Sequence, residues 1–190
     1  RELVSHVQCA AAVPEGSQVL LLEKLPQGVY VDPYQLTSAQ ELSDTQVLLA
    51  SEIDLEAPAY LSSGFSALVY ASLDPQCSGC FTTTLPVHAR YHRPAGSGEA
   101  EQRVTIESPR LLVRAEESTL PLACPQNKVT EAPCTAQNHS LCVWLEIHYQ
   151  QVTASRTGPS ITIPLIVSLH CAIVISDQSH FICTETATLL

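Results

Sequence analysis

The residues best suited to chemistry lie in one stretch of the chain, between positions 77 and 94. A CSGC segment at 77–80 precedes LPVHARYHRP at 85–94, and two cysteines with two histidines match the ligand types of a zinc site. Cys80 and His88 are separated by seven residues, fewer than the roughly twelve of a zinc finger. If residues 81–91 form a strand, His88 and His92 lie about 13 Å apart, too far to share one ion. We therefore predict no metal here.

The CSGC segment also has the form of a redox dithiol. Such dithiols sit at the start of a helix, which lowers the thiol pKa, whereas the residues that follow here, FTTTL, favour an extended chain. We therefore predict structural cysteines. Cys77 and Cys80 bond either to each other or each to one of three others, Cys124, Cys134 and Cys142.

No common catalytic motif occurs in the sequence. It lacks G-x-S-x-G, a phosphate-binding glycine loop, H-E-x-x-H and a dinucleotide glycine pattern. Glu146 and His148 would share one face of a strand, but we interpret that face as the ordinary polar side of a sheet. The sequence therefore predicts no catalytic residue and no cofactor.

Charge and cysteine content restrict the compartment and the partners. The 190-residue chain has a formal net charge of -10, which repels phosphate backbones and argues against nucleic-acid binding. Eight cysteines and a sequon, Asn138-His139-Ser140, favour an oxidising compartment where glycans are added. We therefore predict the secretory pathway, with Asn138 as a glycosylation site.

Strand patterns dominate the remaining sequence. Short apolar runs bounded by Pro, Gly, Ser and Asp occur at 18–24, 45–50, 66–72, 102–107, 110–115 and 141–152. In the last run Val143 and Leu145 alternate with Trp144 and Glu146, which places the two pairs on opposite faces. A capping box within TSAQEL at 37–42 predicts one helix of about two turns. The predicted fold class is mainly β, an antiparallel, sandwich-like domain with one short helix.

The apolar run at 161–175 is short for a membrane helix. Fifteen residues of helix reach about 22 Å, whereas a bilayer core requires about 27–30 Å. Pro164 and His170 also interrupt the run, so that a final buried strand through about Ser168 is favoured. We expect a β domain over residues 1–168 and a divergent tail over residues 169–190.

Three segments resemble a known family: LPQGVYVDPYQL at 25–36, IDLEAPAYLSS at 53–63 and FTTTLPVHARYHRP at 81–94. With the CSGC segment, their order and spacing resemble the PIG-X family, whose domain carries LP-x-G-x-Y-x-DPY, E-x-P-x-Y, C-x-x-C and P-x-H-x-RYH-x-P. The similarity extends from Leu20 to Val167.

The resemblance implies a non-catalytic subunit of GPI mannosyltransferase I, with a β domain in the lumen of the endoplasmic reticulum. Family members are anchored by one C-terminal membrane helix and stabilise the catalytic PIG-M subunit, which adds the first mannose during GPI-anchor biosynthesis. This chain departs from the family where the anchor is expected, because polar SDQSH follows the short apolar run. We expect membrane association through the partner or through an altered C terminus.

The segment at 86–94 has two faces if it is extended. Val87, Ala89 and Tyr91 lie on one face, and His88, Arg90 and His92 lie on the other. Our hypothesis is that this motif either holds neighbouring loops or contacts a partner protein; its candidate residues are His88, Arg90, Tyr91 and Pro94. The alternative function is a secreted or lumenal β-sandwich recognition module unrelated to GPI synthesis.

Overall fold

The computed structural model is built mainly from antiparallel strands, which confirms the predicted fold class. It describes residues 1–9, 16–42, 46–77, 79–93, 104–115, 128–147, 151–152, 168–169 and 183–189. The elements are β1 (Glu2–Cys9), β2 (Gln18–Leu25), β3 (Val29–Tyr30), α1 (Pro33–Leu42), β4 (Gln46–Leu49), the short 3-10 helix η1 (Ala59–Leu61), β5 (Phe65–Leu73), β6 (Cys80–Pro86), β7 (His88–Ala89), β8 (Arg110–Arg114), β9 (Lys128–Pro133), β10 (Leu141–Ile147), β11 (Gln151–Val152), β12 (Ser168–Leu169) and β13 (Cys183–Leu189).

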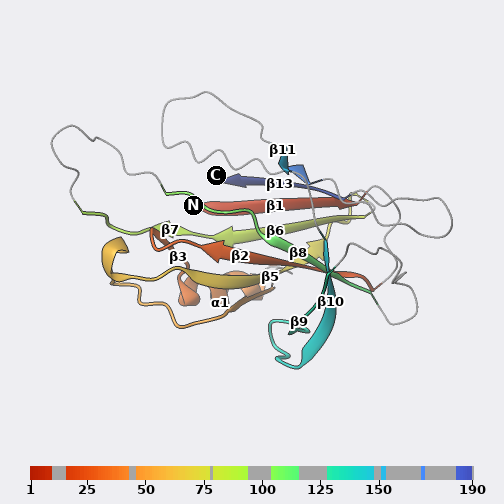
Figure 1. Ribbon diagram of the computed structural model, residues 1–190, viewed down its shortest axis with the longest axis horizontal. Coiled ribbons are helices and arrows are strands. Elements are labelled where there is room, and N and C mark those ends of the chain that lie inside the picture. The colour runs from red at the N-terminus through yellow and green to blue at the C-terminus, as the bar shows by residue number, and fades with distance from the viewer. Residues whose placement is uncertain are drawn as a thin grey trace.

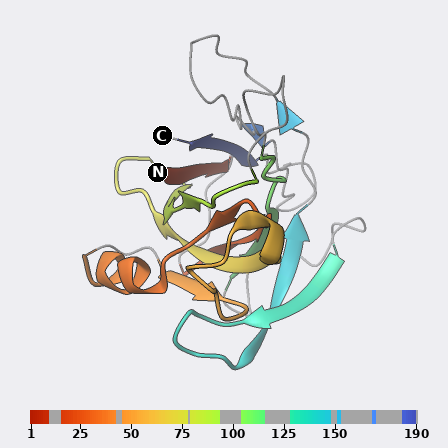
Figure 2. The ribbon, with the colours of Figure 1, turned by 90° about the vertical axis from the view of Figure 1, so that its left-hand side faces the viewer.

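The main sheet bends at β5 and forms two layers. Its strand order is β13-β1-β6-β5-β2-β8-β10-β9, and β4 also pairs with β5. Residues 65–71 of β5 pair with β2, whereas Ser72 and Leu73 pair with β6. The layer that contains β1 and β6 therefore stacks on the layer that contains β2, β5 and β8 (Figures 1 and 2). This arrangement is the predicted sandwich.

The main core lies between the two layers. Leu3 and Phe81 from one layer and Leu21 and Leu111 from the other belong to one cluster of buried side chains, and each is at most 3% exposed. Burial of this apolar surface is the principal source of stability in such a fold.

The outer face of the β2–β5–β8 layer is buried as well. Leu20, Tyr70 and Leu112 pack there against Trp144, which is 0% exposed. Trp144 belongs to the hairpin, by which we mean β9, β10 and their connecting loop at 134–140. This hairpin continues the sheet beyond β8 (Figure 2). Because β2 and β8 are covered on both faces, their sequences are nearly continuous apolar runs.

The alternation predicted for 141–147 is present, but its assigned polar face is wrong. Trp144 and Glu146 are buried, whereas Val143 is 61% exposed. β10 pairs with β8 only at residues 145–147, and residues 141–144 pair only with β9. Val143 therefore lies past the edge of the layer that contains β1 and β6. The opposite face of β10, which carries Trp144, packs against the outer face of the β2–β5–β8 layer. His148 lies outside the described residues.

The helix begins four residues before the predicted segment. Asp32 caps α1, because its Oδ1 accepts hydrogen bonds from the backbone N–H of Tyr34 at 2.8 Å and of Gln35 at 3.4 Å. Pro33 occupies the first helical position, where its missing N–H costs nothing. The Asp-Pro pair therefore sets the start of α1, and the predicted capping box at Thr37 and Ser38 is wrong.

The other strand predictions have mixed outcomes. The runs at 18–24, 45–50, 66–72 and 110–115 correspond to β2, β4, β5 and β8. Residues 104–107 are not a strand; their alternation arises because Ile106 enters the core and Val104 packs against it. Most of the run at 161–175 lies outside the described residues, where only Ser168 and Leu169 form β12. In the tail, β13 pairs with β1 in a register that places Cys183 opposite Cys9.

Candidate functional site

Three segments that are distant in the sequence meet at one end of the sandwich. We call residues 25–36, 53–63 and 86–93 the motif end, which includes β3, β7 and η1 at the left of Figure 1. β7 pairs with β3 through Val29 opposite Ala89. The N–H of Arg90 donates to the Gly28 carbonyl at 2.9 Å, and the N–H of Ala59 donates to the Tyr91 carbonyl at 2.9 Å. These main-chain bonds bring together the segments that carry the family resemblance.

Arg90 is buried at the centre of the motif end. It is 6% exposed, its Nη1 donates to the Ala57 carbonyl at 2.6 Å, and its guanidinium lies 5.0 Å from the centre of the Tyr30 ring. A buried cation is tolerated when hydrogen bonds and an aromatic face replace its water. Arg90 therefore links all three segments from within.

His88 connects β7 to the helix. Its ring stacks on Tyr30 with centroids 5.1 Å apart, and its Nε2 lies 2.6 Å from Gln35 Oε1 in α1. Among the described residues no group of three or more His, Cys, Asp or Glu is arranged to hold a metal ion. The structure instead gives His88 neighbours that position the first turn of α1.

Gly28 permits this close packing. A Cβ atom at this position would lie 2.7 Å from Val104 Cγ2 and 3.2 Å from His92 Cε1. Such distances are too short for any side chain without movement of the segment at 104–107 or of His92. The glycine of the LPQG segment is therefore required by the approach of two other segments.

The outer surface of the motif end is aromatic and apolar. Tyr91 is 89% exposed, Leu61 is 73% exposed and Tyr60 is 48% exposed. Arg93 lies with its guanidinium 4.5 Å from the centre of the Tyr60 ring. Tyr and Arg are the residue types that contribute most to protein–protein interfaces. We call Tyr60, Leu61 and Tyr91 the tyrosine surface.

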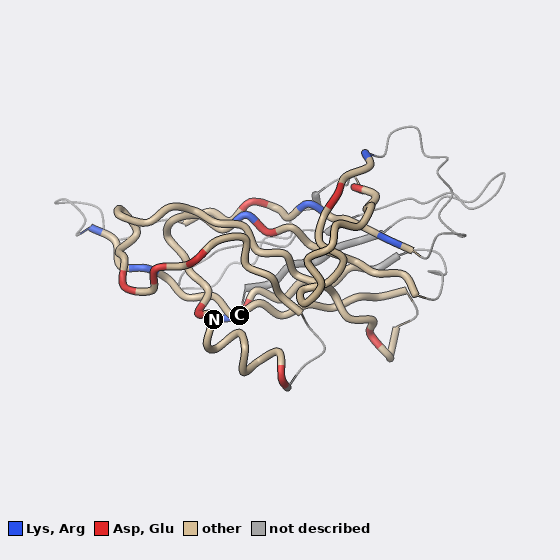
Figure 3. The backbone as a smooth tube through the Cα atoms, turned by 90° about the horizontal axis from the view of Figure 1, so that it is seen from below, with Lys and Arg blue, Asp and Glu red and all other residues tan. Residues whose placement is uncertain are grey.

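A small polar cavity adjoins the tyrosine surface. It has a volume of about 160 Å³, and Glu52, Asp54, Leu61 and Arg90 contribute to its lining. The side chains of Glu52 and Asp54 are exposed, so that carboxylates border this surface. In Figure 3 the basic residues of the described part are dispersed along the backbone.

The structure separates the four candidate residues of the 86–94 motif. His88 and Arg90 make contacts inside the motif end, Tyr91 faces outward, and Pro94 lies outside the described residues. From His88 onward, the face with His88 and Arg90 is thus more buried than the face with Ala89 and Tyr91. Sequence alternation could not show this, because the groups that compensate Arg90 belong to other segments.

Four of the five candidate cysteines form two disulfide bonds. Cys77 bonds to Cys80 in the turn between β5 and β6, where Gly79 has a positive φ of 77°. Cys134 bonds to Cys142 across the hairpin, and Cys124 lies outside the described residues. β6, and not a helix, begins at Cys80, so the described segment lacks the helix start at which a redox dithiol sits.

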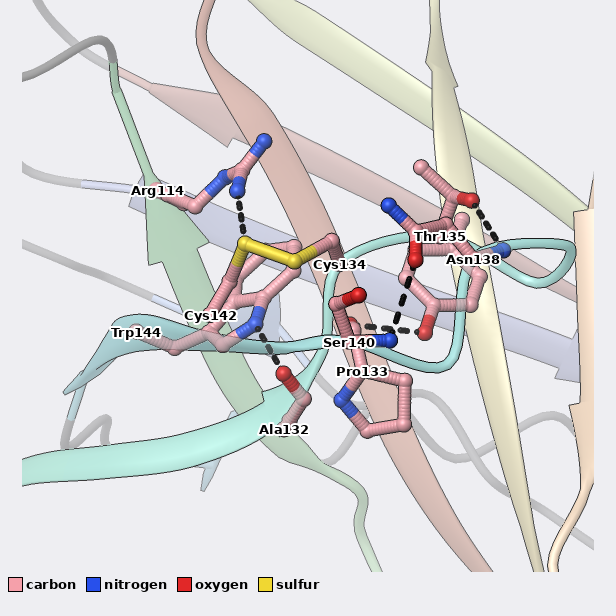
Figure 4. The surroundings of a disulfide bond; sticks show 10 residues. Arg114, Ala132, Pro133, Cys134, Thr135, Asn138, Ser140, Cys142 and Trp144 are labelled. Carbon is pink, nitrogen blue, oxygen red and sulfur yellow. Dashed lines mark hydrogen bonds between the residues drawn. A yellow bond between two sulfur atoms is a disulfide. The ribbon is translucent and has the colours of Figure 1, made fainter.

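The hairpin disulfide packs against the outer-face cluster. Trp144 Nε1 donates to the Ala132 carbonyl at 3.1 Å, and Arg114 Nη1 contacts Cys142 Sγ (Figure 4). The Tyr70 hydroxyl donates to the Pro133 carbonyl at 2.9 Å. Burial raises the pKa of Tyr70 to about 12, although the nearby Arg114 opposes this shift.

Glu146 forms an ion pair with Arg110 of the neighbouring strand. Both guanidinium contacts measure 2.6 Å, from Nε to Oε1 and from Nη2 to Oε2. The hydrogen bond that the Arg110 guanidinium donates to the Glu146 carboxylate raises the pKa of Arg110 above its usual value. Glu146 thus has a structural partner in β8, and the sequence contained no signal for this pairing.

The fold and these sites define a disulfide-bonded β-sandwich that presents an aromatic surface at one end, the features of an interaction domain. The chain belongs to the PIG-X / PBN1 family, whose model matches residues 1–190. The predicted resemblance is therefore confirmed.

Relatives in several organisms support the assignment. The chain is 36% identical over 179 residues to the human protein named GPI alpha-1,4-mannosyltransferase I, stabilizing subunit, and the match covers 93% of this chain and 68% of that protein. The rat protein of the same name is 32% identical, with 93% and 69% covered. Protein PBN1 of Gibberella zeae is 27% identical over 103 residues, which cover 50% of this chain and 21% of PBN1. No solved structure matches significantly.

The described helices do not include a candidate membrane span. In these parts of the chain, no helix combines sufficient length with sufficient apolarity to cross a bilayer.

Proposed function

We propose that this chain is the non-catalytic stabilising subunit of GPI mannosyltransferase I. The observation that carries the proposal is the match along 93% of the chain to relatives that bear this name. In this role the chain binds a PIG-M-type catalytic subunit, which adds the first mannose during GPI-anchor biosynthesis. It acts by protecting that subunit, without contributing a catalytic residue.

The proposed location is the endoplasmic reticulum membrane, with the β domain on the lumenal side. The two disulfide bonds support an oxidising compartment, and the sequon at Asn138 is the proposed site of lumenal glycosylation. Membrane association comes through the partner or through the C-terminal part of the chain. Extraction with alkaline carbonate, with and without the catalytic subunit present, distinguishes these two routes.

The tyrosine surface is the proposed contact with the catalytic subunit. Tyr91 and Leu61 are the most exposed apolar side chains of the motif end apart from Tyr34 of α1. Arg90 fixes the backbone next to them, because its N–H donates to the Gly28 carbonyl and its guanidinium donates to the Ala57 carbonyl. A rigid backbone beneath exposed aromatic side chains lowers the entropic cost of binding, because less of the surface has to become ordered.

The function is tested in cells that lack their own stabilising subunit. The tagged chain should recover the catalytic mannosyltransferase subunit on affinity capture, raise its steady-state amount and restore GPI-anchored proteins at the cell surface. Recovery of an extracellular ligand without any mannosyltransferase subunit would instead support a recognition module of the secretory pathway.

A further inference from the structure

The sequon lies inside the loop that the hairpin disulfide closes. Asn138 is exposed and lies midway between Cys134 and Cys142, which are eight positions apart with a Cα–Cα distance of 5.0 Å. Figure 4 shows Asn138, Ser140 and the disulfide in this single closed loop. Eight residues of extended chain would span about 27 Å. The closed loop therefore cannot extend around its sequon.

Hydrogen bonds also hold the sequon in a turn. The N–H of Ser140 donates to Asn138 Oδ1 at 3.0 Å, and the N–H of Asn138 donates to Thr135 Oγ1 at 2.9 Å. The N–H of Cys134 donates to the Ser140 carbonyl at 2.9 Å, which closes the base of the loop. The carbonyl oxygen of the Asn138 side chain and the Asn138 backbone N–H are thus both held by the loop itself, which fixes the sequon in its turn.

We propose that glycan transfer to Asn138 and closure of the Cys134–Cys142 disulfide compete. A transferase has to hold the Asn138 amide and the Ser140 hydroxyl together in its own site, which requires the turn to open. The reduced loop can open, whereas the disulfide-closed loop cannot. The glycan is therefore added before the hairpin closes, and a chain that closes first stays unmodified. This inference rests on the lumenal location proposed above.

The two reactions share no atoms, so the competition is conformational. Disulfide closure joins the two sulfur atoms, releases two protons and passes two electrons to a disulfide-bearing lumenal oxidant. Glycan transfer joins Asn138 Nδ2 to the anomeric carbon of a lipid-linked oligosaccharide. That carbon breaks its bond to the lipid pyrophosphate, and Nδ2 loses one proton. Either product can form without consuming the groups that the other requires.

The Cys134–Cys142 disulfide is expected to persist once it has formed. Cys134 is 8% exposed, and Arg114 contacts Cys142 Sγ beside the Trp144 ring. Thiol–disulfide exchange requires access of a thiolate to a sulfur atom. The packed disulfide therefore reopens slowly, and the order of the two events decides the outcome.

The test is synthesis of the full chain into microsomal vesicles under oxidising or reducing conditions. Glycan occupancy is measured as a mobility shift that a glycosidase removes and that Asn138→Gln abolishes. The wild-type chain should be partly glycosylated under oxidising conditions, and reductant during synthesis should raise its occupancy several-fold. Combined Cys134→Ser and Cys142→Ser should give the high occupancy under both conditions.

Two controls separate loop closure from general unfolding. Combined Cys77→Ser and Cys80→Ser removes the other disulfide, and Leu21→Ala weakens the main core. Both variants should keep the wild-type dependence of glycan occupancy on reductant.

Equal glycan occupancy of the wild type and the Cys134/Cys142 variant under oxidising conditions would overturn the competition. A rise of occupancy in Leu21→Ala as large as that in the Cys134/Cys142 variant would overturn it as well. If protease protection shows that the chain is inside the vesicles and Asn138 stays unmodified in every variant, the proposal also fails. Capture of the catalytic subunit is measured separately, so that this failure leaves the proposed function standing.

Discussion

The motif end and the hairpin solve the same structural problem by different means. In the hairpin, a disulfide and a fully buried Trp144 hold two adjacent strands against the sheet. In the motif end, main-chain hydrogen bonds and the buried Arg90 hold three segments that are distant in the sequence. A local covalent link stabilises the first region, whereas long-range polar contacts define the second.

This difference bears on the proposed contact between the motif end and the catalytic subunit. The hairpin turns its only tryptophan inward and bonds it to Ala132. The motif end turns Arg90 inward and Tyr91 outward on consecutive residues. Polar contacts fix the backbone at that end and leave large side chains free for a partner, which is the arrangement expected of a binding surface.

The largest expected effect on stability comes from the hairpin. Trp144→Ala should reduce the free energy of unfolding by about 3–5 kcal/mol, because a large buried side chain leaves a cavity. The measurement is chemical denaturation of the purified domain with both disulfides intact. A loss below 1 kcal/mol, on the scale of a surface substitution, would show that the outer-face cluster is not an essential part of the core.

Arg90→Ala should have the second largest effect. It removes the hydrogen bond to Ala57 and the contact with Tyr30, at a cost of about 1.5–3 kcal/mol for a hydrogen bond to a charged group. Arg90→Lys is the matched control, and it should recover only part of this loss because an ammonium lacks the planar fork of donors. Full recovery by lysine would mean that charge alone matters at this position.

A smaller effect is expected at Tyr70, where the hairpin meets the sheet. Tyr70→Phe removes the hydrogen bond to Pro133 and should cost about 1 kcal/mol at neutral pH.

This difference should depend on pH. The pKa of Tyr70 is raised from 10.0 to about 12 in the folded state, so the tyrosine contributes its full stability below pH 10 and loses it as the pH rises toward 12. The slope is about 1.4 kcal/mol per pH unit once the unfolded phenol ionises. The gap between wild type and Tyr70→Phe should therefore close near pH 11, and a gap that stays constant from pH 9 to 11 would contradict the raised pKa.

The fold class and most strands of the β2–β5–β8 layer were predictable because apolar runs of strand length are strong local signals. The start of α1 was also encoded locally, in Asp32 and Pro33, but the later Thr-Ser segment offered a competing cap. β1 and β9 went unrecognised, since His6 and Gln8 or Thr130 and Glu131 interrupt any apolar pattern. Their strand character comes from pairing with β6 and β10.

The contacts of the motif end could not be derived from local pattern. Arg90 and its acceptor Ala57 are 33 positions apart, so the hypothesis that the motif holds neighbouring loops could not say which loop accepts the hydrogen bond. Family resemblance identified the segments, and only the three-dimensional arrangement showed that they meet.

The most direct test concerns Tyr91 and its neighbours on the tyrosine surface. Tyr91→Ala should change the free energy of unfolding by less than about 0.5 kcal/mol, because the side chain is 89% exposed. The hairpin offers a matched control in Val143→Ala, an exposed apolar residue at the other region. Affinity capture of the catalytic mannosyltransferase subunit, with both variants at equal amounts, should show a marked loss for Tyr91→Ala and the wild-type level for Val143→Ala. Wild-type capture by Tyr91→Ala, or a loss confined to Val143→Ala, would contradict the assignment of the motif end as the partner surface.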